Sequence, residues 1–366
     1  MLKFSKIYIL TAIALICSIS LSSCDESIFD YEGDCEVSHI IRFRYDQNLK
    51  WADAFPSEVN SVNLYVYDKN GVFVKKYLGR GEELSSKDYF ILLDLPADSY
   101  KFVAWCGLDN GVGEDKESFS VPEPVAGVSR IEELTCSLNT LRETLEKTRS
   151  EIAGYSDAQL YFMYYGYLEE TLVDNHDGTK YEYTIELTKD TNHIRIILQD
   201  TSGEDLNEAD FELSIEDNNA FIEYDNRLRD TGKVTYMPWA KLSDEVIVGK
   251  VDMVNGSAEL VPVKGVVADF SVSRMMATHN KNMILYIRNS HTKELIAQIP
   301  VIEYALLGRD YYEYAYGHSL TEQDLLDRED EYVLTFFMLN HRWIEGEVLI
   351  HSWRKVKPDY DAAGAE

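Results

Sequence analysis

Apolar and polar residues alternate along much of the chain from residue 39 onward, which is the pattern of half-buried β-strands. Residues 39–45 (HIIRFRY) and 59–68 (VNSVNLYVYD) are the first two predicted strands. The second runs into Asn70-Gly71, a two-residue hairpin signal, so residues 72–78 are predicted to return beside it.

The same alternation continues to the end of the chain. Residues 88–95 and 99–105 predict another strand pair, joined through Pro96-Ala97-Asp98. Further predicted strands cover residues 131–138, 159–168, 181–187, 193–198, 211–215, 245–254, 257–262, 267–273, 283–288, 294–299, 332–338 and 347–353. Asn255-Gly256 marks a further hairpin. Helical segments are expected at 141–152, 301–307 and 321–327.

Short strands at regular spacing, with turn signals between them, predict β-sandwiches rather than a parallel α/β sheet. The chain has 366 residues, more than one core usually organises, so we expect two sandwiches in series. The turn signal Asp177-Gly178 places the junction just before residue 174. The predicted domains are therefore 37–172 and 173–357, followed by a polar tail at 358–366. The 25 tyrosines strengthen the all-β interpretation, because aromatic residues favour pleated surfaces.

The N-terminus departs from this pattern and predicts an exported lipoprotein. A short basic stretch precedes an apolar segment at 7–19, which has the length of a signal-peptide core. It ends in Leu21-Ser22-Ser23-Cys24, the order of a lipobox, which predicts a signal peptide at 1–23, cleavage between Ser23 and Cys24, and a lipid on Cys24. The alternative is a simple secretory signal that Cys24 happens to follow. Residues 24–36 are polar and acidic, and are expected to form a lipidated tether.

Charge and cysteine content exclude some partners and sites. The formal net charge of −29 argues against nucleic acid as a partner. Cys35, Cys106 and Cys136 remain after the signal and the lipidated cysteine, which permits one disulfide. We expect Cys35 with Cys106, because both lie beside predicted strands of one domain; three buried free thiols fit the sequence equally well. No CxxC spacing is present, so the sequence gives no support to a zinc site.

No catalytic motif stands out, and no catalytic residue, cofactor or metal site is predicted. His193 and His291 stand alone, and we interpret them as structural or exposed residues. The segment Asp174 to Gly178 lacks the first acidic ligand of a calcium loop, so we interpret it as a turn. The aromatic run at 311–316 (YYEYAY) either packs on a loop or strand edge or forms a sugar-stacking platform.

Several segments in order resemble the FimB-type fimbrial anchor lipoproteins of Bacteroidia, which include the minor-fimbrium anchor subunits. The resemblance extends over essentially the whole chain after the signal. Besides the lipobox, it lies in 31–35 (YEGDC), 43–46 (FRYD), 62–68 (VNLYVYD), 93–96 (LDLP), 103–108 (VAWCGL), 327–330 (DRED), 332–337 (YVLTFF) and 350–353 (IHSW).

This resemblance implies two tandem transthyretin-like β-sandwich domains on an outer-membrane lipoprotein displayed at the cell surface. Its implied role is the non-catalytic basal subunit of a fimbrium, which attaches the filament through the lipid on Cys24 and limits its length. The implied partners are fimbrial pilin subunits, joined by strand exchange at a sheet edge. A surface glycan-binding lipoprotein and a hydrolase remain as alternatives.

Overall fold

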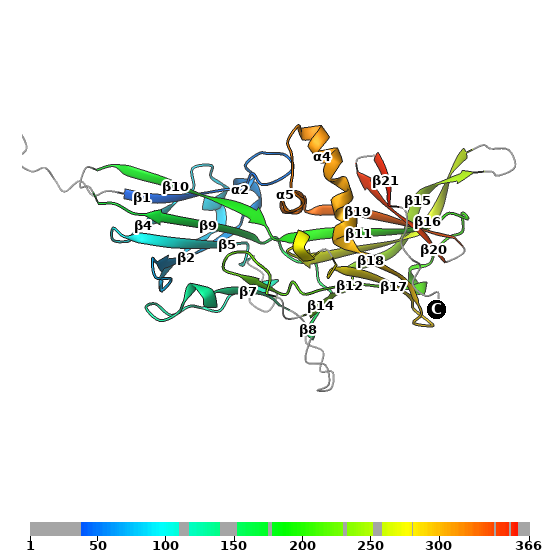
Figure 1. The fold of residues 1–366 in the computed structure, drawn as a ribbon, viewed down its shortest axis with the longest axis horizontal. Coiled ribbons are helices and arrows are strands. Elements are labelled where there is room, and N and C mark those ends of the chain that lie inside the picture. The colour runs from blue at the N-terminus through cyan, green and yellow to red at the C-terminus, as the bar shows by residue number, and fades with distance from the viewer. Residues whose placement is uncertain are drawn as a thin grey trace, which may run out of the picture.

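The computed structural model is an elongated β-protein whose strands run mainly along its long axis (Figure 1). It describes residues 38–109, 117–139, 152–174, 178–229, 233–251, 258–279, 281–339, 342–350 and 353–357. We call the part built on the seven-stranded sheet the first half. The second half contains the six-stranded and five-stranded sheets with helices α3, α4 and α5. The all-β prediction is confirmed.

The first half is a single seven-stranded sheet with the strand order β3-β2-β5-β9-β10-β1-β4. Its strands are β1 (Ser38–Arg44), β2 (Ser61–Asp68), β3 (Phe73–Arg80), β4 (Ile91–Leu93), β5 (Ser99–Cys106), β9 (Tyr164–Thr171) and β10 (Lys180–Lys189). The β2–β3 hairpin turns at Asn70-Gly71 as predicted, with Gly71 at φ +75°. The short helices α2 (Phe55–Glu58) and η1 (Gly81–Ser85) lie in the connections.

The predicted pairing of 88–95 with 99–105 is wrong. β4 pairs with β1, with Leu92 opposite Ile40. β5 instead lies between β2 and β9 and uses both of its edges on them, so it has no free side for β4. The link through Pro96 therefore crosses from a sheet edge to the sheet centre.

The two terminal strands of this sheet, β3 and β4, are joined by side chains. The Tyr77 hydroxyl on β3 accepts a hydrogen bond from the Asp94 backbone N–H just after β4, at 2.9 Å. Lys75 forms an ion pair with the Asp94 carboxylate at 3.1 Å. The sheet therefore curls around an apolar core that includes Phe43 and Phe102.

β10 leads without a turn into β11 (Thr191–Asp200), which is in the six-stranded sheet. Strand pairing thus places the change of sheet at Asp190, and residues 180–189 belong to the first sheet. The division into two domains between residues 172 and 173 stays a prediction. Gly178 has φ +69° as a turn glycine, but Asp177 lies outside the described residues.

The second half contains two packed sheets, of six and five strands. The six-stranded sheet has the order β15-β16-β11-β19-β20-β21, and the five-stranded sheet the order β18-β17-β12-β14-β8. Their remaining strands are β8 (Ile152–Ser156), β12 (Phe211–Asp217), β14 (Lys233–Tyr236), β15 (Ala240–Val251), β16 (Ala258–Ser273), β17 (Ile284–Asn289), β18 (Leu295–Pro300), β19 (Glu331–Leu339), β20 (Arg342–Ile350) and β21 (Trp353–Lys357). The predicted turn at Asn255-Gly256 lies outside the described residues, although Val251 and Ala258 pair on either side of it.

A fourth sheet, of three strands, connects the halves. It contains β13 (Phe221–Glu223), β7 (Thr135–Leu138) and β6 (Phe119–Ser120), in the order β13-β7-β6. Cys136 on β7 belongs to one buried cluster with Trp105 of the first half and Ile194 of the second. The main core is therefore continuous through the molecule.

Three α-helices lie between β18 and β19: α3 (Val301–Ala305), α4 (Arg309–Tyr316) and α5 (Glu322–Arg328), with the turn η6 (Leu306–Gly308) after α3. The predicted helices at 301–307 and 321–327 are confirmed. The aromatic run at 311–316 is in α4 and not on a loop or strand edge, with Tyr312 and Tyr316 stacked one turn apart at 6.1 Å. Segment 140–151, which contains most of the predicted helix 141–152, lies outside the described residues. No described helix is long and apolar enough to cross a membrane.

Candidate functional site

The predicted lipidation and cleavage residues Ser23 and Cys24 lie outside the described residues, as does Cys35. Cys106 is a thiol with no exposed surface, and its expected disulfide with Cys35 stays a prediction. Its side chain faces the core of the curled first sheet. Cys136 is also a buried free thiol, 3.2 Å from the sulfur of Met163. Burial raises the pKa of both thiols, which makes them inert side chains of the core.

The chain enters the described structure at the outer end of the first half, opposite the second half (Figure 1). There, β1 begins at Ser38, whose backbone N–H donates to the Thr179 carbonyl at 3.2 Å. We call this end the entry tip. It is the end of the molecule to which residues 1–37 connect.

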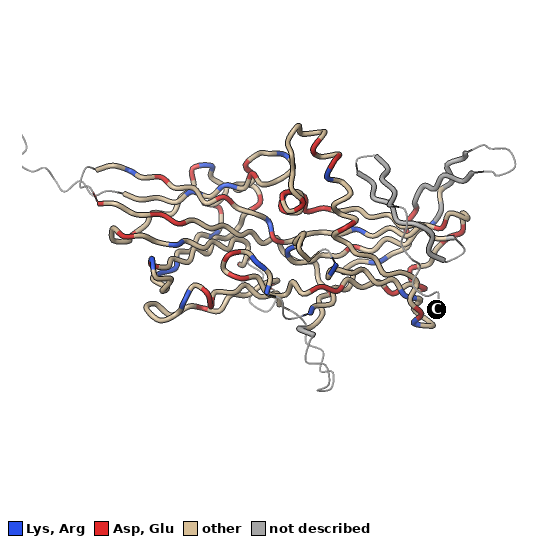
Figure 2. The backbone as a smooth tube through the Cα atoms, viewed as in Figure 1, with Lys and Arg blue, Asp and Glu red and all other residues tan. Residues whose placement is uncertain are grey.

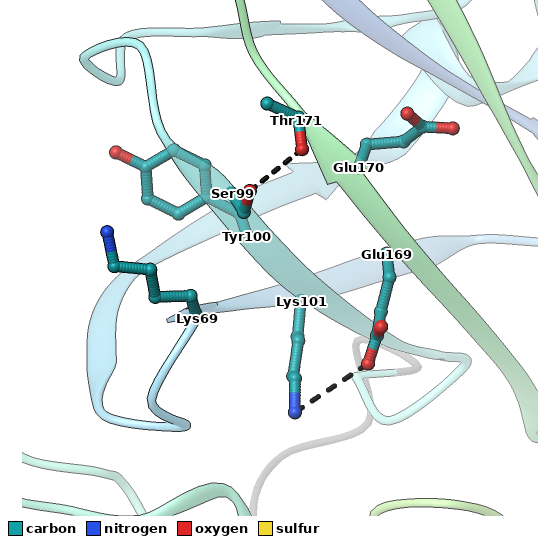
Figure 3. Close-up of a pocket in the computed structure, with 7 residues that line it drawn as sticks. All are labelled: Lys69, Ser99, Tyr100, Lys101, Glu169, Glu170 and Thr171. Atoms are coloured by element: carbon teal, nitrogen blue, oxygen red, sulfur yellow. Dashed lines mark hydrogen bonds and ion pairs between the residues drawn. The ribbon is translucent and has the colours of Figure 1, made fainter.

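A polar pocket lies at the entry tip, across the ends of β5 and β9 (Figure 3). Seven residues line it: Lys69, Ser99, Tyr100, Lys101, Glu169, Glu170 and Thr171. Ser99 and Thr171 share a hydroxyl hydrogen bond of 2.8 Å, and Lys101 pairs with Glu169 at 3.6 Å. Lys69 pairs with Asp98 at 3.1 Å. The cations are therefore neutralised locally, and the pocket contains no nucleophile beside a base.

Strand edges are the second kind of candidate site, because an unpaired edge can bind another strand through its backbone. The first half has little unpaired strand edge. At its start, β3 is bonded by the loop that follows β6, with Phe73 donating to Ser129 and Gly127 donating to Phe73, each at 2.9 Å. Further along β3, Tyr77 and Lys75 bind Asp94 beside β4.

The second half has more open edges. β18 is the last strand of its sheet and pairs with β17 alone. Val301 donates to the Met283 carbonyl at 3.0 Å, and in antiparallel pairing the backbone groups of Gln298 then point away from β17. β15, the terminal strand of the six-stranded sheet, is partly covered, since Lys241 donates to the Phe211 carbonyl at 2.7 Å.

The aromatic run in α4 does not form one exposed face. Tyr312 is buried and donates to Glu329 at 2.6 Å, and Tyr311 packs edge-on against Tyr312. Tyr314 is 86% exposed and Tyr316 is 37% exposed. A sugar platform made from the whole run is therefore absent, and only Tyr314 stands free on the surface.

Buried charges gather where β10 passes into β11. The Lys189 ammonium lies 2.7 Å from Glu58 of the first half and 2.6 Å from Asp330 of the second. Phe162 covers it, with the ammonium 4.2 Å from the ring centre. One cation thus binds both halves at once.

The next residue forms a second buried pair. Asp190, which has no exposed surface, lies 2.5 Å from the guanidinium of Arg274. Arg274 also binds Asp327 at 3.1 Å, and the Asn226 amide donates to Asp190 at 3.2 Å. Burial raises the pKa of Asp190 to about 6, against the lowering effect of Arg274.

The two histidines behave as structural residues. His193 in β11 lies against Phe162, with ring centres 5.1 Å apart, and burial lowers its pKa. His291 is exposed and lies 3.0 Å from Asp210. Among the described residues, no group of three or more histidine, cysteine or acidic side chains could hold a metal ion. Acidic and basic residues are interspersed over both halves (Figure 2).

An elongated β-protein with open terminal strands can join other chains through its backbone, as the subunits of surface filaments do. A family model identifies the class. The chain belongs to the family of fimbrillin-A associated anchor proteins Mfa1 and Mfa2, whose model matches residues 31–358.

Similar proteins agree with this membership. A candidate adhesin from Bacteroides thetaiotaomicron has a crystal structure that is 32% identical, with a TM-score of 0.68 over 86% of this chain and 96% of that one. The fimbrial anchor protein Mfa2 from Porphyromonas gingivalis shares the fold at 14% identity, with a TM-score of 0.59 over 87% of this chain and 99% of that one. A candidate polysaccharide-binding protein from B. thetaiotaomicron shares it at 24% identity, with a TM-score of 0.70 over 88% and 99%.

A curated relative matches a shorter stretch. The minor fimbrium anchoring subunit Mfa2 of P. gingivalis is 29% identical over 99 residues, which is 26% of this chain. The match spans 30% of that relative's own length.

Proposed function

We propose that this protein is the lipid-anchored basal subunit of a fimbrium, attached to the outer membrane through Cys24 and displayed at the cell surface. The observation that carries the proposal is membership of the fimbrial anchor family over residues 31–358. Enzymatic activity has no support in this family or in the described side chains.

The arrangement of the chain suits an anchor. Residues 24–37 would link a lipid on Cys24 to the entry tip, and an extended chain of that length spans at most ~50 Å. The entry tip would then stay near the membrane while the second half points outward (Figure 1). The open edges of the second half, β18 among them, would thereby face arriving fimbrial subunits.

In this proposal, pilin subunits join the anchor by strand exchange at such an edge. Backbone hydrogen bonds along a whole strand make a joint that dissociates slowly. A subunit fixed to lipid at one end adds no further subunit on that side, so filament growth would stop there. The amount of anchor would accordingly limit fimbrial length.

The test is a pair of single cysteine variants in the native host, with C24A as the test and C35A as the matched control. We expect C24A to release fimbriae into the medium, and C35A to leave them on the cells at wild-type length. A pull-down of the membrane-extracted protein should recover pilin-like subunits. Cell-bound fimbriae in C24A, or a pull-down without any pilin, would contradict the anchor role.

A second candidate function is glycan binding, favoured by the exposed ring of Tyr314. Affinity electrophoresis of the wild type and Tyr314→Ala in gels containing surface polysaccharide separates it from the anchor role. Retardation of the wild type that Tyr314→Ala abolishes would support the glycan binder. Equal mobility of both proteins, with or without polysaccharide, would reject it.

A further inference from the structure

The loop between β1 and α2, residues 46–54, carries a tryptophan in an unusual backbone conformation. Trp51 has φ +52°, a left-handed value that costs a non-glycine residue free energy. Its side chain is nevertheless 40% exposed, so burial in a core does not explain the conformation.

Two polar side chains hold this loop in shape. The Asn48 amide donates to the Tyr45 carbonyl at 3.0 Å and to the Ala52 carbonyl at 2.8 Å. The Asp53 carboxylate accepts from the backbone N–H groups of Tyr45 and Phe55, each at 3.0 Å. These four hydrogen bonds hold the backbone of the loop on both sides of Trp51.

The partner of Trp51 is the second half. The guanidinium of Arg328, the last residue of α5, lies 3.7 Å from the centre of the indole ring. His318, just after α4, lies with its ring 4.9 Å from the same indole. Arg328 also donates to the Asp46 carbonyl at 3.2 Å, at the other end of the loop. Figure 1 shows this part of the chain, in blue, beside α4 and α5, in orange.

We propose that the 46–54 loop is a latch that holds the two halves in line, with Trp51 clasped by Arg328 and His318. The latch lies beside the passage from β10 to β11 at Asp190, where the chain crosses from the seven-stranded to the six-stranded sheet. Lys189 pairs with Glu58 and Asp330 at that passage, so the latch adds an outer contact to an inner one. A bend that moves α5 away from the 46–54 loop would break the contacts of Arg328 with Trp51 and Asp46.

The test compares amide hydrogen exchange in the full chain and two variants that open the latch from opposite sides. Trp51→Gly removes the ring, and glycine adopts the positive φ without strain. Arg328→Gln removes the cation. The amides followed are those of Asp190, which donates to Met163, and His193, which donates to Asp330, each at 2.8 Å.

Both variants should exchange roughly fivefold faster at these joint amides, the factor that a cation–π contact at a partly exposed site supports. Amides of β12 and β17, deep in the second half, should exchange at the wild-type rate. Matched controls are Trp239→Gly, an exposed tryptophan elsewhere, and Arg227→Gln, whose cation pairs only two residues away with Asp225.

Wild-type exchange at the joint in both variants would overturn the latch. Faster exchange that spreads equally to β12 and β17 would also overturn it, because the contact would then contribute to general stability and not to the joint. None of these measurements involves fimbriae, so they test the latch independently of the anchor role.

Discussion

Replacing Arg274 with methionine should destabilise the protein in a pH-dependent way. The Arg274 side chain is only 8% exposed, and it neutralises Asp190, which has no exposed surface. Methionine fills much of the same volume but supplies no charge. Breaking a buried pair by removing one partner costs about 3–5 kcal/mol, because the remaining charge is left without compensation.

The sign of the pH dependence follows from the pKa of Asp190. Burial raises that pKa to about 6 in the folded protein, above the value near 3.9 of an unfolded chain. The folded state therefore binds the Asp190 proton more tightly than the unfolded chain does. The stability of the protein with protonated Asp190 is fully present below about pH 4, and it is lost as the pH rises through 6 and Asp190 ionises. Without Arg274, which lowers the pKa, the folded pKa rises further. The stability difference between wild type and Arg274→Met should thus be small near pH 5 and grow toward pH 8.

Urea unfolding followed by tryptophan fluorescence at about pH 5 and pH 8 measures this difference. We expect a loss of about 3 kcal/mol at the higher pH and about half of that or less at the lower. The double variant Asp190→Asn with Arg274→Met is the control, because it removes both charges together. It should lose at least ~1 kcal/mol less than Arg274→Met alone at pH 8. A loss that is the same at both pH values, or a double variant as unstable as the single, would refute the reasoning.

Two further predictions concern glycines and thiols. Gly107 has φ +85° and a methyl group there would lie 2.1 Å from the Phe162 carbonyl oxygen, so Gly107→Ala should lower stability by ~3 kcal/mol or more in thermal unfolding. Gly317 also has positive φ but open space around it, so Gly317→Ala should cost only ~1 kcal/mol; equal losses would contradict the backbone clash. The thiols of Cys106 and Cys136 should resist alkylation in the native protein at pH 8 and react fully in urea, as mass spectrometry would report. Rapid native labelling of either would contradict their burial.

Local signals in the sequence predicted local structure well. Asn70-Gly71 identified the β2–β3 hairpin because glycine supplies the positive φ that the turn needs. Thr321 begins α5 as an N-cap, accepting from the Asp324 backbone N–H at 3.0 Å, which is a local signal for the start of a helix. Such features depend on residues a few positions apart.

Features that depend on pairing between residues far apart in the sequence could not be predicted from it. β4 precedes β5 directly in the chain but pairs with β1, because the choice is made by neighbours across the sheet. The signal at Asp177-Gly178 lies between β9 and β10, which are antiparallel neighbours in one sheet. A turn signal there is equally consistent with a hairpin inside a domain and with a junction. The actual change of sheet at Asp190 has no turn residue, since β10 continues into β11.

The candidate site shows the same contrast. The predicted lipobox ending in Cys24 is a linear motif, while the latch brings together Trp51 and Arg328, which are 277 positions apart in the sequence. One local hint was present, because Asn48 and Asp53 are residues that bind neighbouring backbone groups and fix loops. No residue near Trp51 in the sequence indicates that it contacts Arg328.

The connection between the halves has consequences for how the molecule bears a pull along its length. β10 is flanked by β9 and β1, and β11 by β16 and β19, so the chain passes from one sheet centre to the next. A pull between the entry tip and the second half therefore loads these ladders in shear, with many backbone hydrogen bonds resisting together. At Asp190, between the two ladders, side-chain contacts replace backbone hydrogen bonds in resisting the pull. Lys189 pairs with a carboxylate of each half, Arg274 neutralises Asp190, and Trp51 contacts Arg328 at the surface. The proposed basal role would need this continuity, because the two ends of the molecule would then be fixed to different structures.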